Sequence, residues 1–380
     1  MSPRRIGILF GMEREFPPAL AERINALAEG RVVAEPAQVG VVRDRDLPGY
    51  DLILDRISHE VPFYRTWLKT AAARGTRVVN NPFWWSADDK FLGNVIALDA
   101  GVAVPKTALV PHKEHPPNTR GDSFTNLRYP LDWDTLFRDI GFPLFLKPAH
   151  GGGWRDVHRV ESPEAFFRAY DTTKDLLMIA QEAIEFTEYY RCYVLGRERV
   201  RVMAYDPRQP FERRYVRDAE VLPPARLARL ERDALTLCKA LGYDFNTIEF
   251  AVRDGTPYAI DFMNPAPDCD RFSVGVENFE WVVSNSAEVL LDRVRKPAKL
   301  EVAGGWIKRA GRKLGAAAGA VGAGVRKRRP AKRRRPAAAG TDATPRPRPA
   351  RRAPARRTAA QPGTDGSREP APAHESGGAS

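Results

Sequence analysis

The first 80 residues alternate short apolar runs with amphipathic stretches. The runs at 4–10, 51–57 and 76–80 are apolar enough to predict buried strands. The stretches between them, 17–29 and 62–74, have apolar residues at helical spacing, and a glycine follows each, which is a common signal for the end of a helix. Strands that alternate with helices of this length are typical of βαβ units, so we expect a small α/β domain with a parallel sheet.

After residue 80 the patterns continue, but the strands now follow one another in pairs. The predicted helices are 86–101, 132–140, 163–170, 223–241 and 279–294. The predicted strands are 102–110, 143–147, 157–160, 176–184, 189–195, 199–205, 247–252 and 257–262. The chain therefore predicts a second, larger region with hairpins, which extends to about residue 301.

The composition changes at about residue 302 to Ala, Pro, Arg, Gly and Ser. Such a segment cannot bury enough apolar surface to offset its chain entropy, so we expect residues 302–380 to be a disordered tail. The tail carries 19 Lys and Arg against 4 Asp and Glu, a net charge of +15, whereas residues 1–301 carry 41 basic and 44 acidic residues. The net charge of +12 therefore belongs to the tail, which suggests contact with nucleic acid or another polyanion.

Three single cysteines, Cys192, Cys238 and Cys269, form no CxxC pair, which favours a reducing compartment. The N-terminal apolar run is too short for a signal peptide, and no stretch approaches the roughly 18 apolar residues of a membrane span. We therefore expect a cytoplasmic protein without membrane contact. The sequence leaves the oligomeric state open, with a dimer as one option.

A strand that ends in a glycine-rich loop is the most informative stretch. Lys147 closes the apolar run, and Pro148 stops the strand because proline has no N–H to donate. Gly151, Gly152 and Gly153 follow, where the backbone can turn freely and approach a ligand. A fixed lysine beside bare N–H groups indicates phosphate binding. The alternative is a flexible hairpin tip, and the stretch lacks the GK[ST] of a P-loop.

Other charged residues stand near the predicted ends of strands and helices. Lys90 lies in the first turn of a predicted helix, where a lysine is tolerable if an anion is nearby; the alternative is a solvated lysine. Arg56 and His59 follow a strand end, where open α/β sheets carry ligands, and a solvated loop explains them equally well.

The last predicted hairpin carries two carboxylates, Glu249 and Asp261, whose directions depend on the turn. A two-residue turn at 254–255 would put Glu249 opposite Ile260 and the carboxylates on opposite faces. A three-residue turn at 253–255 would put both carboxylates on one face, with room for an ion between them. With this turn the other face would be entirely apolar, with Ile248, Phe250, Val252, Tyr258, Ile260 and Phe262. We therefore predict the three-residue turn and a metal site at the two carboxylates; the alternative to that site is a pair of exposed acids on a solvated face of the sheet.

Four segments in this order resemble the ATP-grasp superfamily, which includes D-alanine–D-alanine ligase, glutathione synthetase and the ribosomal-protein glutamate ligases. They are NPFWWSADDK, FPLFLKPAHGGG, MIAQEAIEFTEYYRCYVLG and TIEFAVRDGTPYAIDFMNP. The similarity covers roughly residues 80–270, and residues 1–80 resemble the preATP-grasp domain. It implies an ATP-grasp domain at 81–301, with a lid subdomain at about 105–185 and a metal-binding subdomain at about 186–301.

The resemblance implies roles for residues at matching positions. The expected ATP-binding residues are Lys90, Lys147, Gly151, Gly152 and Gly153 at the phosphates, the backbone of Glu182, Ala183 and Ile184 at the adenine, and Glu188 at the ribose. The expected ligands of Mg²⁺, or of Mn²⁺, are Glu249, Asp261 and Asn264. Two stretches depart from the family: Trp154-Arg155-Asp156 replaces a further glycine, and two residues instead of one separate Asp261 from Asn264.

The implied activity is ATP-dependent ligation of a small-molecule carboxylate to an amine, or to a thiol, through an acyl phosphate. The carboxylate needs a cationic anchor, and arginine binds carboxylates bidentately. Among Arg191, Arg201, Arg213 and Arg214, we favour Arg191, which the resemblance also indicates, and Arg214. One alternative is a kinase-like or regulatory protein that binds MgATP without forming an amide. Another is a nucleic-acid-binding protein that uses the tail.

Overall fold

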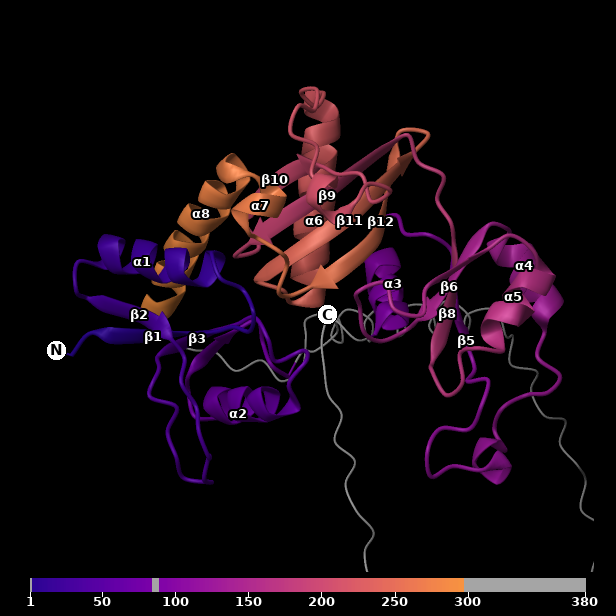
Figure 1. The fold of residues 1–380 in the computed structure, drawn as a ribbon, viewed down its shortest axis with the longest axis horizontal. Coiled ribbons are helices and arrows are strands. Elements are labelled where there is room, and N and C mark those ends of the chain that lie inside the picture. Colours follow the sequence, from indigo (N-terminus) through magenta and orange to yellow (C-terminus); the bar gives the residue numbers. More distant parts are fainter. Residues whose placement is uncertain (1, 84–88, 297–380) are drawn as a thin grey trace, which may run out of the picture. The chain divides into compact units, whose positions relative to one another are not determined.

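A computed structural model describes residues 2–83 and 89–296, which contain three four-stranded sheets and the helices that pack on them (Figure 1). The strand orders are β2-β1-β3-β4, β5-β8-β6-β7 and β10-β9-β11-β12. This arrangement confirms the predicted mixture of a parallel α/β sheet and antiparallel sheets. Within the described ranges, no helix is long and apolar enough to cross a bilayer.

The N-terminal sheet is parallel throughout, as predicted. Its elements are β1 (Arg4–Leu9), α1 (Phe16–Ala28), β2 (Val32–Pro36), β3 (Leu52–Asp55), α2 (Pro62–Ala73) and β4 (Arg77–Val79). The sequence interpretation missed β2. That strand is five residues long and buries only Val32 and Ala34, so its apolar signal is weak.

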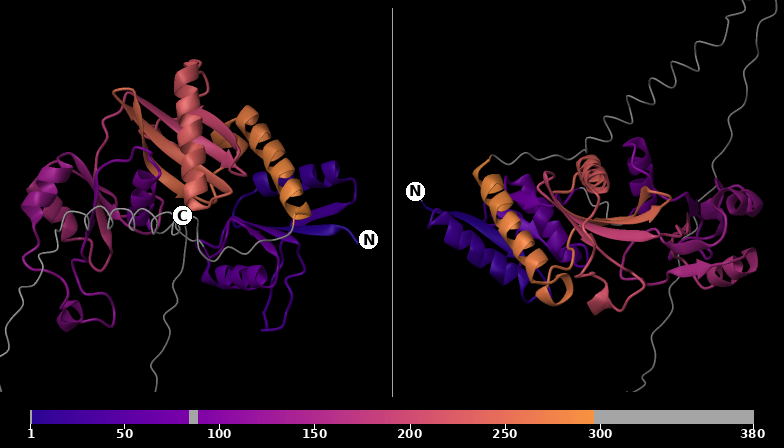
Figure 2. Two further views of the ribbon diagram at one scale, coloured as in Figure 1. Left: turned by 180° about the vertical axis from the view of Figure 1, so that it is seen from behind. Right: turned by 90° about the horizontal axis from the view of Figure 1, so that it is seen from above.

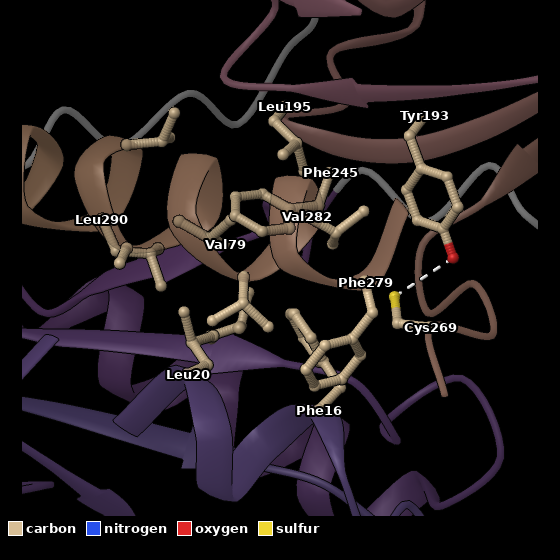
Figure 3. Packing of buried hydrophobic residues seen from close by; sticks show 14 of the residues in the cluster. Phe16, Leu20, Val79, Tyr193, Leu195, Phe245, Cys269, Phe279, Val282 and Leu290 are labelled. Carbon is tan, nitrogen blue, oxygen red and sulfur yellow. Dashed lines mark hydrogen bonds between the residues drawn. The ribbon is translucent and has the colours of Figure 1, made fainter. Parts of the chain in front are cut away.

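Helix α1 packs against α8 (Val276–Arg295), the last helix of the described chain. Phe16 and Leu20 of α1 lie in the same buried cluster as Phe279 and Leu290 of α8, as Figure 3 shows. The N-terminal sheet and the C-terminal helix therefore share one continuous hydrophobic core, although the sequence assigned them to different domains.

The second sheet is antiparallel and has its own aromatic core. Its elements are β5 (Thr107–Val110), η1 (Gly121–Phe124), α4 (Trp133–Ile140), β6 (Leu144–Pro148), β7 (His158–Val160), α5 (Pro163–Tyr170) and β8 (Met178–Glu182). Trp133 and Phe166 pack between helices and sheet with ring centroids 5.5 Å apart. Strand β5 is shorter than predicted, because Pro105 lies where the strand would continue and proline cannot donate to a ladder.

The third sheet carries the carboxylates and is covered on one face by α6 (Figure 2). Its elements are α3 (Lys90–Asp99), β9 (Glu188–Leu195), β10 (Arg199–Ala204), η2 (Phe211–Arg213), α6 (Pro224–Leu241), β11 (Phe245–Arg253), β12 (Thr256–Asn264) and α7 (Arg271–Val274). Helix α3 begins at Lys90, with Asp89 as its N-cap, and the predicted start at residue 86 lies outside the described residues.

The predicted three-residue turn between β11 and β12 is wrong. Arg253 pairs with Thr256, so Asp254 and Gly255 form a two-residue turn, and both have positive φ angles, 51° and 73°. Such a turn matches the twist of paired strands, and Asp-Gly is a favoured sequence for it. The predicted apolar face is also wrong at two positions, because Tyr258 and Ile260 pack toward the cluster on the opposite face from α6.

Candidate functional site

The two predicted phosphate-binding lysines come together at the glycine loop. Lys90 is the first residue of α3, and its backbone N–H donates to the Ala149 carbonyl at 3.0 Å. Its side-chain Nζ donates to the Gly151 carbonyl. Lys147 lies on β6, two residues before Ala149. The start of α3 and the end of β6 thus meet at the glycine loop, which Lys90 contacts and Lys147 precedes.

Lys147 also lies within the electrostatic reach of the hairpin carboxylates. Burial lowers the pKa of Lys147 to about 8, and the nearby Lys90 adds to this lowering. Asp261 and Glu249 act in the opposite direction, because a carboxylate stabilises the charged amine. Two positive and two negative groups from four elements, α3, β6, β11 and β12, therefore lie within reach of one another.

The glycine loop is exposed and has space around it. Gly151 and Gly153 have φ angles of 81° and 73°, and a side chain at either would meet no atom within 4 Å. Trp154 and Asp156 also have positive φ angles, 61° and 54°. These two residues stand in the part of the loop where the ATP-grasp pattern has a further glycine, and they keep the left-handed backbone that glycine favours.

Glu249 and Asp261 pair across β11 and β12 despite the two-residue turn. A register shift follows the pair of Phe250 with Ala259, and it sets Glu249 opposite Asp261 instead of Ile260. An inserted residue of this kind is a β-bulge, which redirects side chains. Both carboxylates therefore lie on one face, as predicted, but a bulge and not the turn is responsible.

A second register shift brings Asn264 to the same face. Thr247, two residues before Glu249, pairs with Asn264, which is three residues after Asp261. The buried side chain of Asn246 holds this bulge: its Oδ1 accepts from the Asn264 N–H and its Nδ2 donates to the Phe262 carbonyl, both at 2.8 Å. The extra residue between Asp261 and Asn264 is thus taken up by the bulge.

These three side chains fit a magnesium ion. Burial raises the pKa of Glu249, and the neighbouring Asp261 raises it further. A divalent cation between the two carboxylates would relieve that repulsion, and carboxylate and amide oxygens are ligands that magnesium accepts. No group of three or more His, Cys, Asp or Glu side chains in the described ranges could hold a metal. Two carboxylates and Asn264 would therefore bind the ion together with phosphate oxygens and water.

Glu249 is held by two neighbours on β9. The Tyr189 hydroxyl donates to Glu249 Oε2 at 2.7 Å, and Arg191 Nε lies 3.7 Å from Glu249 Oε1. Arg191 is 8% exposed, and its guanidinium lies 5.4 Å from the Tyr205 ring centroid and 5.8 Å from that of Tyr215. Tyr189, Tyr205 and Tyr215 were not predicted at this site. Only Tyr189 had a sequence signal, because it alternates with Arg191 and Tyr193 in the sequence YYRCY and so shares their face.

Of the other predicted carboxylate anchors, Arg214 lies nearest to this site. Its charge acts on Glu249, its side chain hydrogen-bonds to Tyr205, and its Nε donates to the Gln209 carbonyl at 3.1 Å. Arg201 is engaged elsewhere, in an ion pair with Glu277 of α8. Arg213 is exposed.

The expected adenine-binding segment follows β8. The Glu182 N–H donates to the Lys106 carbonyl at 2.9 Å and the Ala183 N–H to the Pro143 carbonyl at 3.1 Å, so these two donors are already used. The Glu182 carboxylate binds Arg253 at 2.7 Å. Ala183 and Ile184 are buried.

The expected ribose-binding residue, Glu188, is also held by neighbours. It accepts hydrogen bonds from Arg226 at 2.7 Å and from the Tyr190 hydroxyl. A ribose hydroxyl at Glu188 would add to these contacts or displace one of them.

Arg56 is not a solvated loop residue, which was the alternative to a ligand-binding role. It is 3% exposed and binds the Glu13 carboxylate through Nε at 2.7 Å. Its Nη2 also donates to the Pro267 carbonyl at 2.6 Å. Arg56 therefore ties the N-terminal sheet to the loop after β12. His59 lies 3.9 Å from Glu60.

Comparison with solved structures identifies the fold. An ATP-bound D-alanine–D-alanine ligase of Bacillus anthracis aligns with a TM-score of 0.55 and 18% identity, over 77% of this chain and 97% of that chain. A RimK domain ATP-grasp protein of Sphaerobacter thermophilus gives the same TM-score and identity, over 76% and 99%. The chain therefore has the ATP-grasp fold, which confirms the resemblance predicted from its four motifs.

Curated relatives match more limited stretches. D-alanine–D-alanine ligase of Oceanobacillus iheyensis is 24% identical over 250 residues, 59% of this chain and 66% of the relative. Human mitochondrial pyruvate carboxylase is 29% identical over 189 residues, 46% of this chain and 15% of that enzyme. The chain thus spans less than two thirds of either relative. No family model matches the chain.

Proposed function

We propose that the protein is an ATP- and magnesium-dependent ligase that joins a carboxylate to an amine through an acyl phosphate. One observation carries this proposal: Lys90 and Lys147 meet at the glycine loop within reach of Glu249 and Asp261. Phosphoryl transfer needs positioning and charge neutralisation more than covalent help from the protein. Two lysines, loop N–H groups and a carboxylate pair supply that environment.

In the first step, a carboxylate oxygen of the substrate attacks the γ-phosphorus, and the bond from that phosphorus to the β–γ bridging oxygen breaks, which releases ADP. In the second step, the amine nitrogen attacks the acyl carbon, the carbon–oxygen bond to phosphate breaks, and the nitrogen loses a proton. Magnesium at Glu249, Asp261 and Asn264 would neutralise phosphate charge. Lys90 and Lys147 would bind the phosphate oxygens, since both lie at the loop.

Arg191 and Arg214 are proposed to bind and orient the substrate carboxylate. Arg191 is buried, and its Nε lies 3.7 Å from Glu249 Oε1. Arginine suits this role because its planar fork matches a carboxylate. The three cysteines are buried free thiols, which supports a cytoplasmic location as part of this proposal.

The test is ATP turnover by Lys147→Ala, with Lys239→Ala, an exposed lysine on α6, as the matched control. Loss of a charge-assisted phosphate contact should weaken ATP binding by about 1.5–3 kcal/mol, and turnover by more. The readouts are ADP and phosphate release with panels of carboxylates and amines, with product masses measured. Wild-type turnover by Lys147→Ala would refute the site, and ADP release without any amide would favour a kinase-like protein.

A further inference from the structure

A second polar cluster lies where the loop after β12 meets the loop after β1. The loop after β12 carries Asp268 and Asp270, and the loop after β1 carries Glu13 and Glu15. The two loops touch, since the Glu15 carboxylate accepts a hydrogen bond of 2.7 Å from the Arg271 N–H. Neither aspartate belongs to the proposed ATP or magnesium site.

Each aspartate turns one carboxylate oxygen inward without a partner. Asp268 Oδ1 accepts from the Asp270 N–H at 3.1 Å, whereas Asp268 Oδ2 and Asp270 Oδ1 are shielded from solvent and lack a hydrogen-bond partner among the described residues. Buried carboxylate oxygens are costly unless a donor satisfies them. The two oxygens are therefore suited to receive a donor from a ligand.

The surroundings of Asp270 are predominantly acidic. Burial raises the pKa of Asp270, and the charges of Asp268, Glu15 and Glu13 raise it further, whereas a hydrogen bond from the Phe16 backbone N–H acts in the opposite direction. The buried Arg56 is already used by Glu13 and the Pro267 carbonyl. A cation at the two aspartates would remove a repulsion that the arginine leaves in place.

Tyr215 supplies an independent third group. It is 6% exposed, and its hydroxyl has no hydrogen-bond partner in the described part of the chain. Tyr215 lies in the same buried cluster as Cys269, the residue between the two aspartates, and Arg217 Nη2 donates to the Phe272 carbonyl at 3.3 Å, which ties the Tyr215 segment to this loop. Burial raises the pKa of the Tyr215 hydroxyl, the Arg191 charge lowers it, and the Asp268 charge raises it. A buried hydroxyl normally has a partner.

The position of Tyr215 connects the acidic cluster to the proposed active site. The Arg191 guanidinium lies 5.8 Å from the Tyr215 ring centroid and 3.7 Å from the Glu249 carboxylate. Arg191 thus lies beside both the carboxylate that would hold magnesium and the ring of Tyr215.

We propose that Asp268, Asp270 and Tyr215 form a subsite for a primary ammonium group of the acceptor substrate. This inference rests on the proposed ligase function. An ammonium group has three donors, and the cluster offers three unpartnered acceptor atoms: Asp268 Oδ2, Asp270 Oδ1 and Tyr215 Oη. A trimethylated ammonium has no N–H and cannot donate to any of these atoms, so it is the matched negative probe. Since the attacking amine must be neutral, the acceptor carries a second amine, as a diamine or a basic amino acid does.

The test is the affinity of the full-length protein for amines, which calorimetry measures in the presence of a non-hydrolysable ATP analogue and magnesium. The probes are lysine, norleucine and Nε-trimethyl-lysine, and 1,4-diaminobutane beside butylamine. We expect lysine or diaminobutane to bind at least about tenfold more tightly than its analogues, as a charge-assisted contact requires. Equal affinities within both sets, or no binding of lysine and diaminobutane, would overturn the subsite.

Three variants probe the acceptor atoms: Asp268→Asn, Asp270→Asn and Tyr215→Phe. Each should reduce the preference for the second amine by about tenfold, whereas Asp175→Asn, an exposed carboxylate before β8, should leave it unchanged. Tyr215→Phe should keep or raise the thermal stability, because it removes a buried hydroxyl without a partner. A loss of stability with an unchanged amine preference would show a structural role instead.

The subsite and the ligase function can fail separately. If Lys147→Ala lowers ATP turnover but amine affinities do not differ, only the subsite is wrong. If the amine preference is found but Lys147→Ala keeps wild-type turnover, the ATP site is wrong and the subsite needs another reaction.

Discussion

Glu249 stands opposite Asp261 because β12 has one more residue than β11 between the turn and this pair. The same device is repeated farther along the hairpin, where one residue separates Thr247 from Glu249 and two separate Asp261 from Asn264. Two bulges therefore convert an irregular spacing in sequence into a row of side chains on one face.

Asn246 is predicted to be a main support of the second bulge. Its buried side chain satisfies the Asn264 N–H and the Phe262 carbonyl. Asn246→Ala leaves both backbone groups unpaired, so we expect a loss of about 2–4 kcal/mol in the free energy of unfolding. Urea denaturation measures it, with the exposed Asn126→Ala as control. Equal stabilities of the two variants would contradict this role.

The hairpin also shows what the sequence could and could not predict. The apolar alternation on β11 was sufficient to place Ile248 and Phe250 on one face and Glu249 on the other, and the structure shows that α6 covers the first of these faces. It could not reveal the bulges, because an extra residue shifts the register without changing composition. The role of Asn246 was equally hidden, since a buried amide that bonds to the neighbouring backbone has no periodic signal in sequence.

Contacts between residues far apart in the sequence also could not be predicted. The position of Arg56 after a strand end was correct, but its partners Glu13 and Pro267 lie 43 and 211 residues away. Local spacing predicts which residues share a strand end, and it does not predict which distant loop covers that end. The two lysines were placed by motif, and their meeting at Gly151 required the fold.

Loss of the charges on Glu249 and Asp261 should abolish magnesium-dependent turnover, and the protein should still fold. The double variant Glu249→Gln, Asp261→Asn keeps the shape of both side chains but removes two charges. We expect magnesium-dependent turnover to fall by at least about 100-fold, as expected when the ligands of a catalytic metal are changed. Because burial raises the pKa of Glu249, thermal stability near neutral pH should hold or rise. Full magnesium-dependent activity in the double variant would contradict the site.

Arg56 should be important for stability rather than for turnover chemistry. Arg56→Met leaves the half-buried Glu13 carboxylate and the Pro267 carbonyl without their donor, so we expect a loss of about 2–4 kcal/mol in the free energy of unfolding. The double variant Arg56→Met, Glu13→Leu removes both charges and should recover part of that loss. Thermal denaturation of the two variants tests the pair, and a double variant less stable than Arg56→Met would contradict it.

The tail is predicted to be dispensable for ATP chemistry. Residues 302–380 carry a net charge of +15, and every predicted site residue precedes them. A chain that ends at Glu301 should therefore keep ATP turnover and lose most of its salt-sensitive affinity for single-stranded RNA or heparin. Turnover and polyanion binding are measured at two salt concentrations. Loss of turnover with small substrates would mean that the tail takes part in the reaction.

Lys147 should make ATP binding depend on pH near 8. Burial lowers its pKa from 10.5 to about 8, so the folded protein releases this proton more readily than the unfolded chain does. Between about pH 8 and 10.5 the unfolded chain binds more protons, so this group makes stability rise with pH in that window. Bound phosphates would stabilise the charged amine, so ATP binding should take up protons near pH 8 and weaken by up to about tenfold per pH unit above it. Calorimetry in two buffers with different ionisation enthalpies measures the uptake.

Lys147→Arg is the control, because it stays charged throughout this pH range. It should show no proton uptake from this position, and its affinity for ATP should not change with pH. Uptake of the same size in Lys147→Arg and in the wild type would mean that another group binds the proton.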